Sequence, residues 1–416
     1  MGKGLDRIKY WAQIFLVPLY GLSYLAPRNK KLWLFGSTFG RRFSENPRYM
    51  YLYVSQHKED ETSPAFGIRP IWISHNKEAV SFLTKKGYEA YYYHSLKGIL
   101  LALRAGVYIF DNYSKDINFW QSGRALKINL WHGSGNKQTN HDNIHDRVRH
   151  PRNAWERWTT WLRRLSDEKP YHYTLATSDA MAKIYTSAFN TDIEHILVCG
   201  NTRNDVFFPE EESGIQNLYS EKELMLRSEI VRHKKAGRKI LAYLPTFRDS
   251  EKLFFDVMDM GAFDAYLKER GYVLAAKLHP KSRIRSAFEA VQGENILNIN
   301  SEMDVYSFFD LCDVLITDYS SAYTDFMLTK RPVVAFDFDW EEYSKDSREC
   351  YIDQDEYMPE IKAMTMEELM RAIDEVVKCD THLPERLVSR ERMFKYIEGS
   401  SSRRMTAMVK ELVVGM

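Results

Sequence analysis

The feature that most constrains this chain is a repeated pattern of short apolar runs that end in polar or glycine residues. Segments of helical character separate them. In the first part of the chain they are Leu32–Ser37, Arg69–Ser74, Gly106–Asn112 and Leu126–Gly133. Strand-like runs spaced by helices indicate βαβ units and a parallel sheet. The pattern predicts an α/β fold with functional residues where strands end, since ligands bind outside the carboxyl ends of such strands.

A similar series continues as far as Asp339, and a stretch rich in Glu, Lys and Arg, roughly 209–239, interrupts it. These runs are Tyr173–Asp179, His195–Asp205, Arg238–Ser250, Tyr272–Pro280, Val314–Ser321 and Pro332–Asp339. A length of 416 residues suits two domains. We therefore predict two doubly wound Rossmann-like domains, at 31–205 and 206–390, with an N-terminal segment 1–30 and a C-terminal helix 391–416.

The composition excludes some classes of protein. With 44% hydrophobic and 28% charged residues, the chain has enough apolar material for cores and no sign of long disorder. A net charge of +1 gives no indication of nucleic-acid binding. Four cysteines are scattered, which argues against a disulfide framework or a cysteine zinc site and fits a reducing compartment. They are Cys199, Cys312, Cys350 and Cys379.

Two segments have the character of a membrane surface. Trp11–Ala26 is apolar, but it is shorter than the roughly 20 residues that span a bilayer, and cations including Arg28 and Lys30 flank it. We predict that it lies on an anionic membrane surface; a helix docked on the core and a signal peptide are the alternatives. Pro151–Leu165 would place three tryptophans on one helical face beside arginines, which fits either a core helix or contact with anionic lipid.

Polar residues at two later strand ends suit phosphate. After the strand that begins at Val314, Ser320 or Ser321 is placed to cap a helix running to about Lys330. A helix N-terminus binds phosphate well, although a plain serine cap is the alternative interpretation. His279 ends another strand and is followed by Lys281 and Arg283, which would suit a loop facing phosphate.

An earlier strand end carries a candidate general base. In Leu130–Gln138, His132 follows the strand and precedes two glycines and Lys137; a histidine here could accept a proton. The segment His141–His145 imitates a metalloprotease motif, but its aspartate is short and no third ligand is evident, so a solvated loop is favoured over a metal site. No Walker-type or dinucleotide-binding glycine motif is present.

Together these motifs resemble the CDP-glycerol or CDP-ribitol glycerophosphotransferases, which build teichoic acids and similar poly(alditol phosphate) polymers. The resemblance runs from about Lys31 to Arg404. It rests on the order of LWHGSGNK, ATSDAMAKIY, GNTRNDVFF, YLPTFRDS, KLHP, LITDYSS, FDFDWEEY and EGSSSRR. The family is similar to GT-B glycosyltransferases, so it implies two Rossmann-like domains facing across a cleft, with the nucleotide held by the C-terminal one.

The resemblance also implies roles for individual residues. His132 matches the proposed base for the acceptor hydroxyl, and His279 matches a catalytic histidine near the pyrophosphate. Ser320 and Ser321 match the phosphate-binding serines, and Lys281, predicted from its place after His279, is grouped with them. The nucleotide-binding positions are Thr246, Phe247 and Arg248. Other motif positions are Lys137, Arg203, Asn204, Asp205 and Asp318. Asp318 and the neighbouring Tyr319 are expected to shape the turn rather than to face the donor.

The implied reaction needs neither a cofactor nor a metal, although Asp318 leaves a weak possibility of one. The implied partners are a CDP-glycerol or CDP-ribitol donor, a lipid-linked saccharide or polyol-phosphate acceptor and an anionic membrane, with the protein peripheral at the cytoplasmic face. Departures from the family pattern, at Ser134–Asn136, Thr202 and Pro359–Glu360, put the acceptor in doubt more than the reaction. A nucleotide-sugar glycosyltransferase and a non-catalytic scaffold of the same fold are the rivals, and both primase and polymerase activity remain open.

Overall fold

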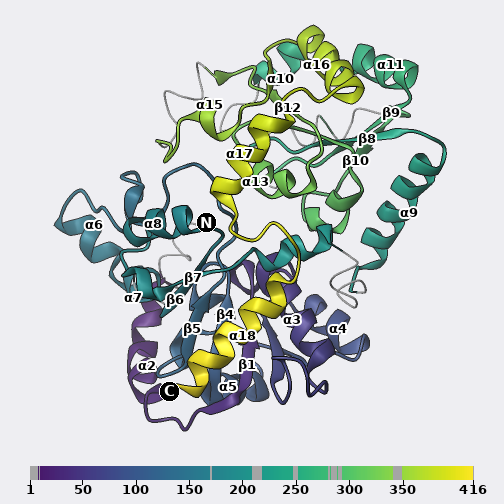
Figure 1. The fold of residues 1–416 in the computed structure, drawn as a ribbon. Coiled ribbons are helices and arrows are strands. Elements are labelled where there is room, and N and C mark those ends of the chain that lie inside the picture. The colour runs from purple at the N-terminus through teal and green to yellow at the C-terminus, as the bar shows by residue number, and fades with distance from the viewer. Residues whose placement is uncertain are drawn as a thin grey trace. The chain divides into compact units, whose positions relative to one another are not determined.

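The computed structural model describes residues 8, 10–168, 171–208, 218–246, 252–279, 282, 288, 293–340 and 349–415. Contacts divide the chain into two compact units, each built on its own sheet (Figure 1). Unit 1 comprises Met1–His132, Thr139–Leu218 and Glu398–Met416, and unit 2 comprises Gly133–Gln138 and Tyr219–Ile397. The predicted α/β class is confirmed.

Unit 1 contains a seven-stranded parallel sheet in the order β3-β2-β1-β4-β5-β6-β7. Strands β1, β4 and β5 are adjacent, so the residues that follow them meet at one edge. The core beside them includes Leu34, Ile73, Tyr108 and Phe110, all fully buried. The strands are β1 (Asn29–Phe35), β2 (Arg69–Ser74), β3 (Ala90–Tyr92), β4 (Ala105–Phe110), β5 (Leu126–Asn129), β6 (Tyr173–Ala176) and β7 (Ile196–Val198).

The helices of unit 1 come from both ends of the chain. The last helix, α18, packs against α3 and against the 3-10 turn η7 (Thr202–Phe207), although almost two hundred residues separate that turn from it (Figure 1). The central stretch of unit 1 runs to Leu218, past the division that we predicted at residue 205, and the unit is completed by Glu398–Met416. The helices are α2 (Val17–Ser23), α3 (Glu45–His57), α4 (Lys77–Lys85), α5 (Leu96–Arg104), α6 (Ala154–Thr159), α7 (Trp161–Asp167), α8 (Asp179–Ala188) and α18 (Ser401–Val414).

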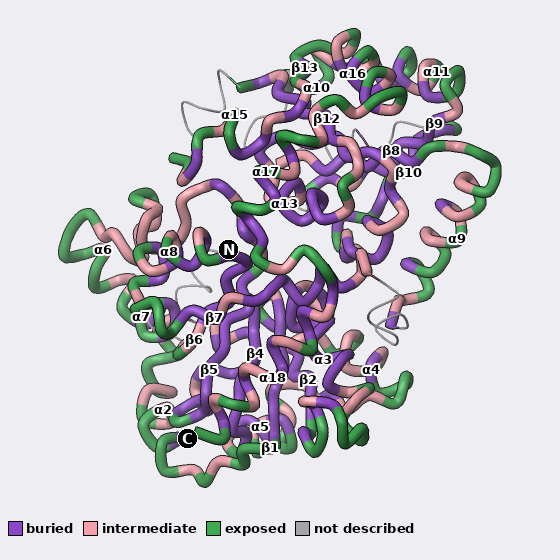
Figure 2. The backbone as a smooth tube through the Cα atoms, in the orientation of Figure 1, coloured by how far each residue is buried: buried purple, intermediate pink, exposed green. Residues whose placement is uncertain are grey.

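Unit 2 contains a six-stranded parallel sheet in the order β10-β9-β8-β11-β12-β13. Its strands are short, and the four inner ones are almost entirely buried (Figure 2). The apolar core beside them includes Leu241, Phe263, Ile316 and Ile373. The strands are β8 (Lys239–Tyr243), β9 (Tyr272–Ala276), β10 (Ile296–Asn298), β11 (Val314–Thr317), β12 (Val333–Phe336) and β13 (Ile361–Ala363).

Helices follow most strands of unit 2, as the sequence pattern predicted. The described helices are α9 (Glu221–Lys235), α10 (Lys252–Val257), α11 (Met260–Arg270), α13 (Ala322–Phe326), α15 (Gln354–Tyr357), α16 (Met366–Lys378) and α17 (Leu383–Met393). The helix expected to run to about Lys330 is shorter than predicted: α13 passes into a 3-10 turn, Met327–Thr329, and Lys330 ends it in the left-handed conformation. The expected C-terminal helix 391–416 is α18 alone, with α17 ending before it.

The predicted tryptophan helix is broken into α6 and α7 at Thr160. The hydroxyls of Thr159 and Thr160 both donate to backbone oxygens one turn earlier, with Thr160 Oγ1 2.7 Å from the oxygen of Glu156. Such bonds compete with the helical ones and favour an end or a bend. Leu162 is buried, whereas Trp155 and Trp158 are 68% and 54% exposed, so this segment has both a core face and a solvent face.

The N-terminal segment packs beside these helices. The ring centroids of Trp11 and Trp158 lie 4.5 Å apart, and Tyr10 and Arg163 are joined by a hydrogen bond of 3.4 Å. Both segments carry large apolar side chains that are exposed, and we call this set of side chains the aromatic surface. Its members are Ile8, Ile14, Phe15, Leu22, Leu25, Trp155, Trp158, Trp161 and Leu165. Among the described residues, no helix has the length and hydropathy needed to cross a bilayer.

Arg28 differs from the prediction that it flanks this segment as a membrane-facing cation. Its guanidinium donates to the backbone oxygens of Ala102, Ser23 and Gln121 at 2.8, 3.0 and 2.7 Å. Burial lowers its pKa from the ordinary arginine value. Arg28 therefore ties the N-terminal segment to the rest of unit 1. Of the described cations that follow the segment, Lys30 and Lys31 are exposed.

Candidate active site

Both sheets reverse their strand order once, and predicted site residues gather at these points. The reversal falls between β1 and β4 in unit 1 and between β8 and β11 in unit 2. Ligands of open α/β sheets bind outside the carboxyl ends of the strands at such a switch point. Thr246 follows β8, Asp318 follows β11, and His132 follows β5, which is adjacent to β4. Each unit therefore presents a candidate site where its fold favours one.

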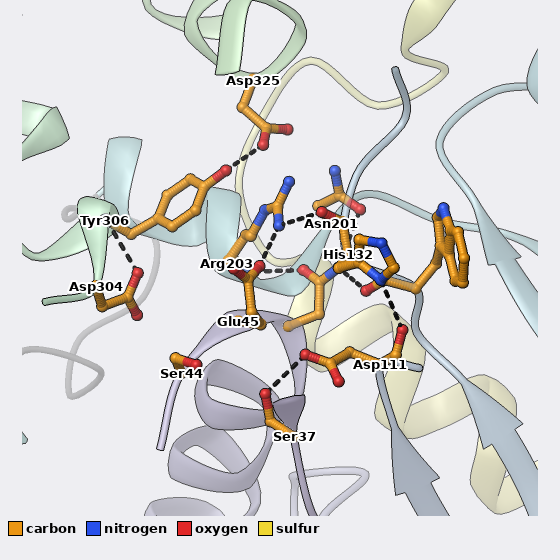
Figure 3. Close-up of polar contacts among 12 residues, drawn as sticks. Ser37, Ser44, Glu45, Asp111, His132, Asn201, Arg203, Asp304, Tyr306 and Asp325 are labelled. Atoms are coloured by element: carbon orange, nitrogen blue, oxygen red, sulfur yellow. Dashed lines mark hydrogen bonds and ion pairs between the residues drawn. The ribbon is translucent and has the colours of Figure 1, made fainter. Parts of the chain in front are cut away.

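The imidazole of His132 is held by the strand next to its own. Its Nδ1 lies 3.1 Å from the backbone oxygen of Asp111, which directly follows β4 (Figure 3). A carbonyl oxygen can only accept, so Nδ1 carries the proton in this contact. The neutral ring then has its acceptor at Nε2. Because His132 is exposed, its side chain has the tautomer and the access that a general base requires.

A pair of buried carboxyl groups supports this loop. Asp111 accepts from Ser37 Oγ at 2.7 Å and from the amide of Thr38 at 2.9 Å. Asp116 accepts from the amide of Phe39 at 2.9 Å. Burial first, and the neighbouring Asp111 second, raise the pKa of Asp116 well above its ordinary value. These bonds fix the residues after β1 against those after β4, at the switch point of unit 1.

Arg203 reaches the backbone of the same histidine. Its guanidinium is 3% exposed, pairs with the carboxylate of Glu45, and donates to the oxygen of His132 at 2.8 Å (Figure 3). Glu45 begins α3 with a φ of +62°, a conformation uncommon outside glycine. Arg203 and the buried Asn204 both lie in η7. The Arg-Asn-Asp motif thus belongs to unit 1, and its arginine fixes the chain beside His132.

Asp205, the third residue of the motif, caps the last helix. Its carboxylate accepts from the amides of Ser401 and Ser402, each at 2.8 Å, at the start of α18. Such an acceptor satisfies amides that have no partner within the helix. Burial raises the pKa of Asp205 to about 6 despite these bonds.

We expect Asp205→Ala to lower the melting temperature of the full chain by several degrees. The substitution leaves two buried amides without an acceptor, and each such loss costs about 1–3 kcal/mol. In a domain of this size about 1 kcal/mol shifts the melting temperature by about 2–4 °C. Calorimetry measures the shift, and Asp205→Asn, which keeps one oxygen, is the control. Equal melting of Asp205→Ala and the wild type would contradict the capping role.

The raised pKa predicts a pH dependence with a definite sign. An unfolded aspartate has a pKa of about 3.9, and Asp205 has one of about 6 when folded. Between these values the folded chain holds the proton more tightly, so the stability that Asp205 contributes falls as pH rises from about 4 to about 6. The melting temperature of the wild type relative to Asp205→Asn should therefore fall over this window and level off above it.

In unit 2, Asp318 joins the two strands that flank the switch point. Its buried carboxylate accepts from the amide of Thr246 at 2.9 Å and from Thr246 Oγ1 at 2.6 Å. Ser320 Oγ accepts from the amide of Ala322 at 3.3 Å, and Ser321 directly precedes α13. The contacts of Asp318 agree with the expected turn-shaping role, and they leave the two serines at the mouth of the strand–helix connection.

The segment after His132 packs within unit 2 against this same connection. Ser134 accepts from Thr324 Oγ1 at 2.9 Å through its backbone oxygen, and Lys137 Nζ lies 5.6 Å from the ring centroid of Tyr319. A Cβ on Gly135 would lie 3.3 Å from Ser321 Cβ, which is tighter than most real contacts. The structure therefore brings Lys137 close to the predicted phosphate-binding loop.

Of the other residues predicted for the donor site, the structure describes only some. His279 is exposed and follows β9, which is adjacent to β8, so it lies at the same sheet edge as Thr246. Phe247, Arg248 and Lys281 lie outside the described residues. In the described parts of the chain, no group of three or more His, Cys, Asp or Glu side chains could hold a metal ion.

The polar groups of the segment His141–His145 contact neighbouring residues of unit 1. The carboxylate of Asp142 accepts from Ser187 Oγ at 3.0 Å at the end of α8. The backbone oxygen of His141 lies 2.6 Å from His150 Nε2. These contacts connect the loop to its neighbours and support the interpretation of the segment as a loop.

Three residues of the His132 environment were missed in the sequence. Asp111 ends a predicted strand, so the strand-end rule alone could have identified it. Glu45 and Asn46 begin a helix rather than follow a strand, and their partners lie more than eighty residues away in the sequence. A pattern of neighbouring residues cannot predict contacts at such a separation.

Comparison with known proteins shows the family to which the chain belongs. The sequence model of the family described as CDP-Glycerol:Poly(glycerophosphate) glycerophosphotransferase matches residues 19–411. The chain is 23% identical over 403 residues to a teichoic acid glycerol-phosphate transferase of Staphylococcus aureus, covering 91% of this chain and 92% of the relative. It is 25% identical over 411 residues to a teichoic acid poly(glycerol phosphate) polymerase of Bacillus spizizenii, covering 96% and 97%.

Some relatives are longer, and the chain spans 33% and 49% of the length of two other polymerases. Among solved structures, the wall teichoic acid polymerase TagF matches with a TM-score of 0.73 and 22% identity, covering 99% of this chain and 97% of that one. This match shows a shared fold of the GT-B-like type with two parallel sheets. The chain belongs to the CDP-glycerol:poly(glycerophosphate) glycerophosphotransferase family.

Proposed function

We propose that this chain transfers a glycerol-phosphate or ribitol-phosphate unit from a CDP-alditol to a hydroxyl of a lipid-linked acceptor in the synthesis of a teichoic-acid-like polymer. The observation that carries the proposal is the family match over residues 19–411. The tautomer of His132, set by its 3.1 Å contact with Asp111, supports it. A structure of TagF, which shares the fold, was obtained after a soak with CDPG.

In the proposed reaction the acceptor hydroxyl gives its proton to Nε2 of His132. The oxygen of that hydroxyl forms a bond to the phosphorus that carries the alditol. The bond from that phosphorus to the oxygen of the CMP phosphate breaks, and CMP leaves with the electron pair. Phosphoryl transfer of this kind depends on positioning and on stabilising charge, so hydrogen-bond donors aimed at the donor phosphates would supply much of the catalysis.

For the donor, we propose that Ser320, Ser321 and Lys281 bind the phosphates and that His279 lies near the pyrophosphate. Thr246, Phe247 and Arg248 would line the nucleotide side. The location of Thr246 and the serines at the switch point of unit 2 supports this assignment. Lys137 adds a cation near the same loop.

The test is an assay of the purified full chain with CDP-glycerol, CDP-ribitol and UDP-sugars on a synthetic lipid-linked acceptor. Release of CMP from a CDP-alditol, with growth of the acceptor, is expected. Release of UDP instead would identify a glycosyltransferase, and no release from any donor would favour a scaffold. Product length then distinguishes a primase, which adds one unit, from a polymerase.

We further propose that the aromatic surface rests on an anionic membrane at the cytoplasmic face, where a lipid-linked acceptor would be found. Phe15 and Leu25 are 82% and 80% exposed, which is unusual for such large apolar side chains. The exposed Arg157 and Arg163 accompany the tryptophans of α6 and α7. Apolar side chains with neighbouring cations favour the interface of an anionic bilayer.

We expect Phe15→Asp combined with Trp155→Asp to abolish most binding to anionic vesicles. Burial of one large apolar side chain contributes about 1.5–3 kcal/mol, so the double substitution should weaken binding by at least about a hundredfold. Cosedimentation with phosphatidylglycerol-containing vesicles measures it. Val388→Asp, at a side chain 70% exposed in unit 2, is the matched control. Unchanged cosedimentation of the double variant would contradict the assignment.

Substitution is preferable to removing residues 1–30, because removal would also delete Arg28 and its bonds to the rest of unit 1.

A further inference from the structure

The loop that carries His132 has a strained backbone immediately before the histidine. Trp131 has a φ of +53°, a conformation that a bulky side chain rarely adopts. Such a residue costs about 1–3 kcal/mol and persists only where its surroundings hold it. One restraint is local, since the amide of Trp131 donates to Asn129 Oδ1 at 2.9 Å. This bond holds the amide of Trp131 but not the carbonyl groups of Leu130 and Trp131, which are bound by another residue.

Asn46 supplies that restraint from α3. Its side chain is fully buried, and Nδ2 donates to the backbone oxygens of Leu130 at 3.1 Å and Trp131 at 2.9 Å. These are the two residues that precede His132. The next oxygen, that of His132 itself, accepts from Arg203. Three consecutive carbonyl groups are therefore bound from outside the loop.

The same carboxamide also binds the turn that carries Arg203. Asn46 Oδ1 accepts from the amide of Arg203 at 3.1 Å, and the backbone oxygen of Asn46 accepts from Thr202 Oγ1 at 2.6 Å. One side chain thus connects the end of β5 to η7. Only a carboxamide offers donors and an acceptor in this planar arrangement, so neither aspartate nor leucine can replace it.

From this geometry we propose that Asn46 is a positioning residue for His132, an inference that rests on the proposed function of His132 as the base. Asn46 contacts no reacting group. It fixes the oxygens of Leu130 and Trp131, and thereby the course of the chain that holds the imidazole against Asp111. Without it, the strained turn relaxes and the proton of the neutral ring is no longer confined to Nδ1. A displacement of about 1 Å costs about a hundredfold in rate.

The experiment compares Asn46→Asp and Asn46→Ala with the wild-type full chain. Asn46→Asp keeps the size of the side chain and its acceptor. The carbonyl oxygens of Leu130 and Trp131, however, lose the donor that Nδ2 provides. We expect kcat for transfer from CDP-glycerol to fall by about ten- to a hundredfold in both variants, with KM for the donor unchanged. Asn76→Ala is the control, because Asn76 caps α4 in the same unit and its loss removes a helix cap without touching the loop. A fall in kcat no larger than that of Asn76→Ala would overturn the proposal.

A second readout does not depend on turnover. Nitrogen NMR of histidine-labelled protein, assigned with His132→Gln, reports which ring nitrogen of His132 carries the proton. The wild type should show Nδ1–H, and the Asn46 variants should show a mixture of tautomers. Retention of pure Nδ1–H would refute the positioning role even if activity fell. If no donor is turned over by the wild type, the proposed function fails, while the tautomer shift still tests Asn46.

Discussion

His132→Ala should lose most of its turnover, by about 10²–10⁴-fold, while affinity for the CDP-alditol stays near that of the wild type. A general base contributes this much when it takes the proton of the attacking hydroxyl. The ring is exposed and its position depends on the contact of Nδ1 with Asp111. Truncation therefore removes the base without opening a core. Single-turnover rates with saturating donor measure the effect, and calorimetric titration with CDP-glycerol measures affinity.

His145→Ala is the matched control, because His145 is also exposed and belongs to the segment that imitates a metal motif. Its turnover should equal that of the wild type. Turnover of His132→Ala within a few-fold of the wild type would show that the base lies elsewhere. A loss of donor affinity in His132→Ala, in turn, would point to a role for His132 in binding the donor.

The double variant Ser320→Ala with Ser321→Ala should bind the CDP-alditol about a hundredfold more weakly. A hydrogen bond to a charged group contributes about 1.5–3 kcal/mol, and two hydroxyls at the start of α13 would each supply one to the phosphates. Ser320 Oγ accepts from the amide of Ala322 in the structure, so its own proton can be donated to a ligand. Titration calorimetry with CDP-glycerol and with CMP measures the two affinities.

Ser187→Ala, an exposed serine in unit 1, controls for the loss of a hydroxyl as such. The weakening should be larger for the CDP-alditol than for CMP, which lacks the second phosphate. Equal affinity of the double variant and the wild type for both ligands would exclude the serines from the donor site.

The strands and the main strand-end residues could be predicted from the sequence because their causes are local. An apolar run such as Val314–Thr317 is buried on both faces in a parallel sheet, and the polar residues that follow it have to lie at the edge. His132, His279 and the serines at 320 and 321 were identified in this way, whereas Thr246 was identified only through the family resemblance. The family resemblance added the order of the motifs and their proposed roles.

What could not be predicted depends on partners far apart in the chain. The carboxamide of Asn46 has its partners at Leu130 and Arg203, and nothing in its own neighbourhood signals them. Arg28 was interpreted as a membrane-flanking cation because its backbone acceptors, such as Ala102, are distant in sequence. The break at Thr160 had a local cause, two adjacent threonines, that a search for helical periodicity alone overlooks.

The placement of α18 has a consequence for how the protein is made. Unit 1 needs this helix, which packs on α3 and is capped by Asp205, yet it is synthesised after the whole of unit 2. Domains generally fold as units as they leave the ribosome, the N-terminal one first. Here that order is reversed. Unit 2 is completed earlier in synthesis, while the carboxylate of Asp205 still lacks the two amides of α18 that it binds in the finished fold. A released chain that ends before residue 401 should therefore have a protease-resistant unit 2 and a protease-sensitive unit 1.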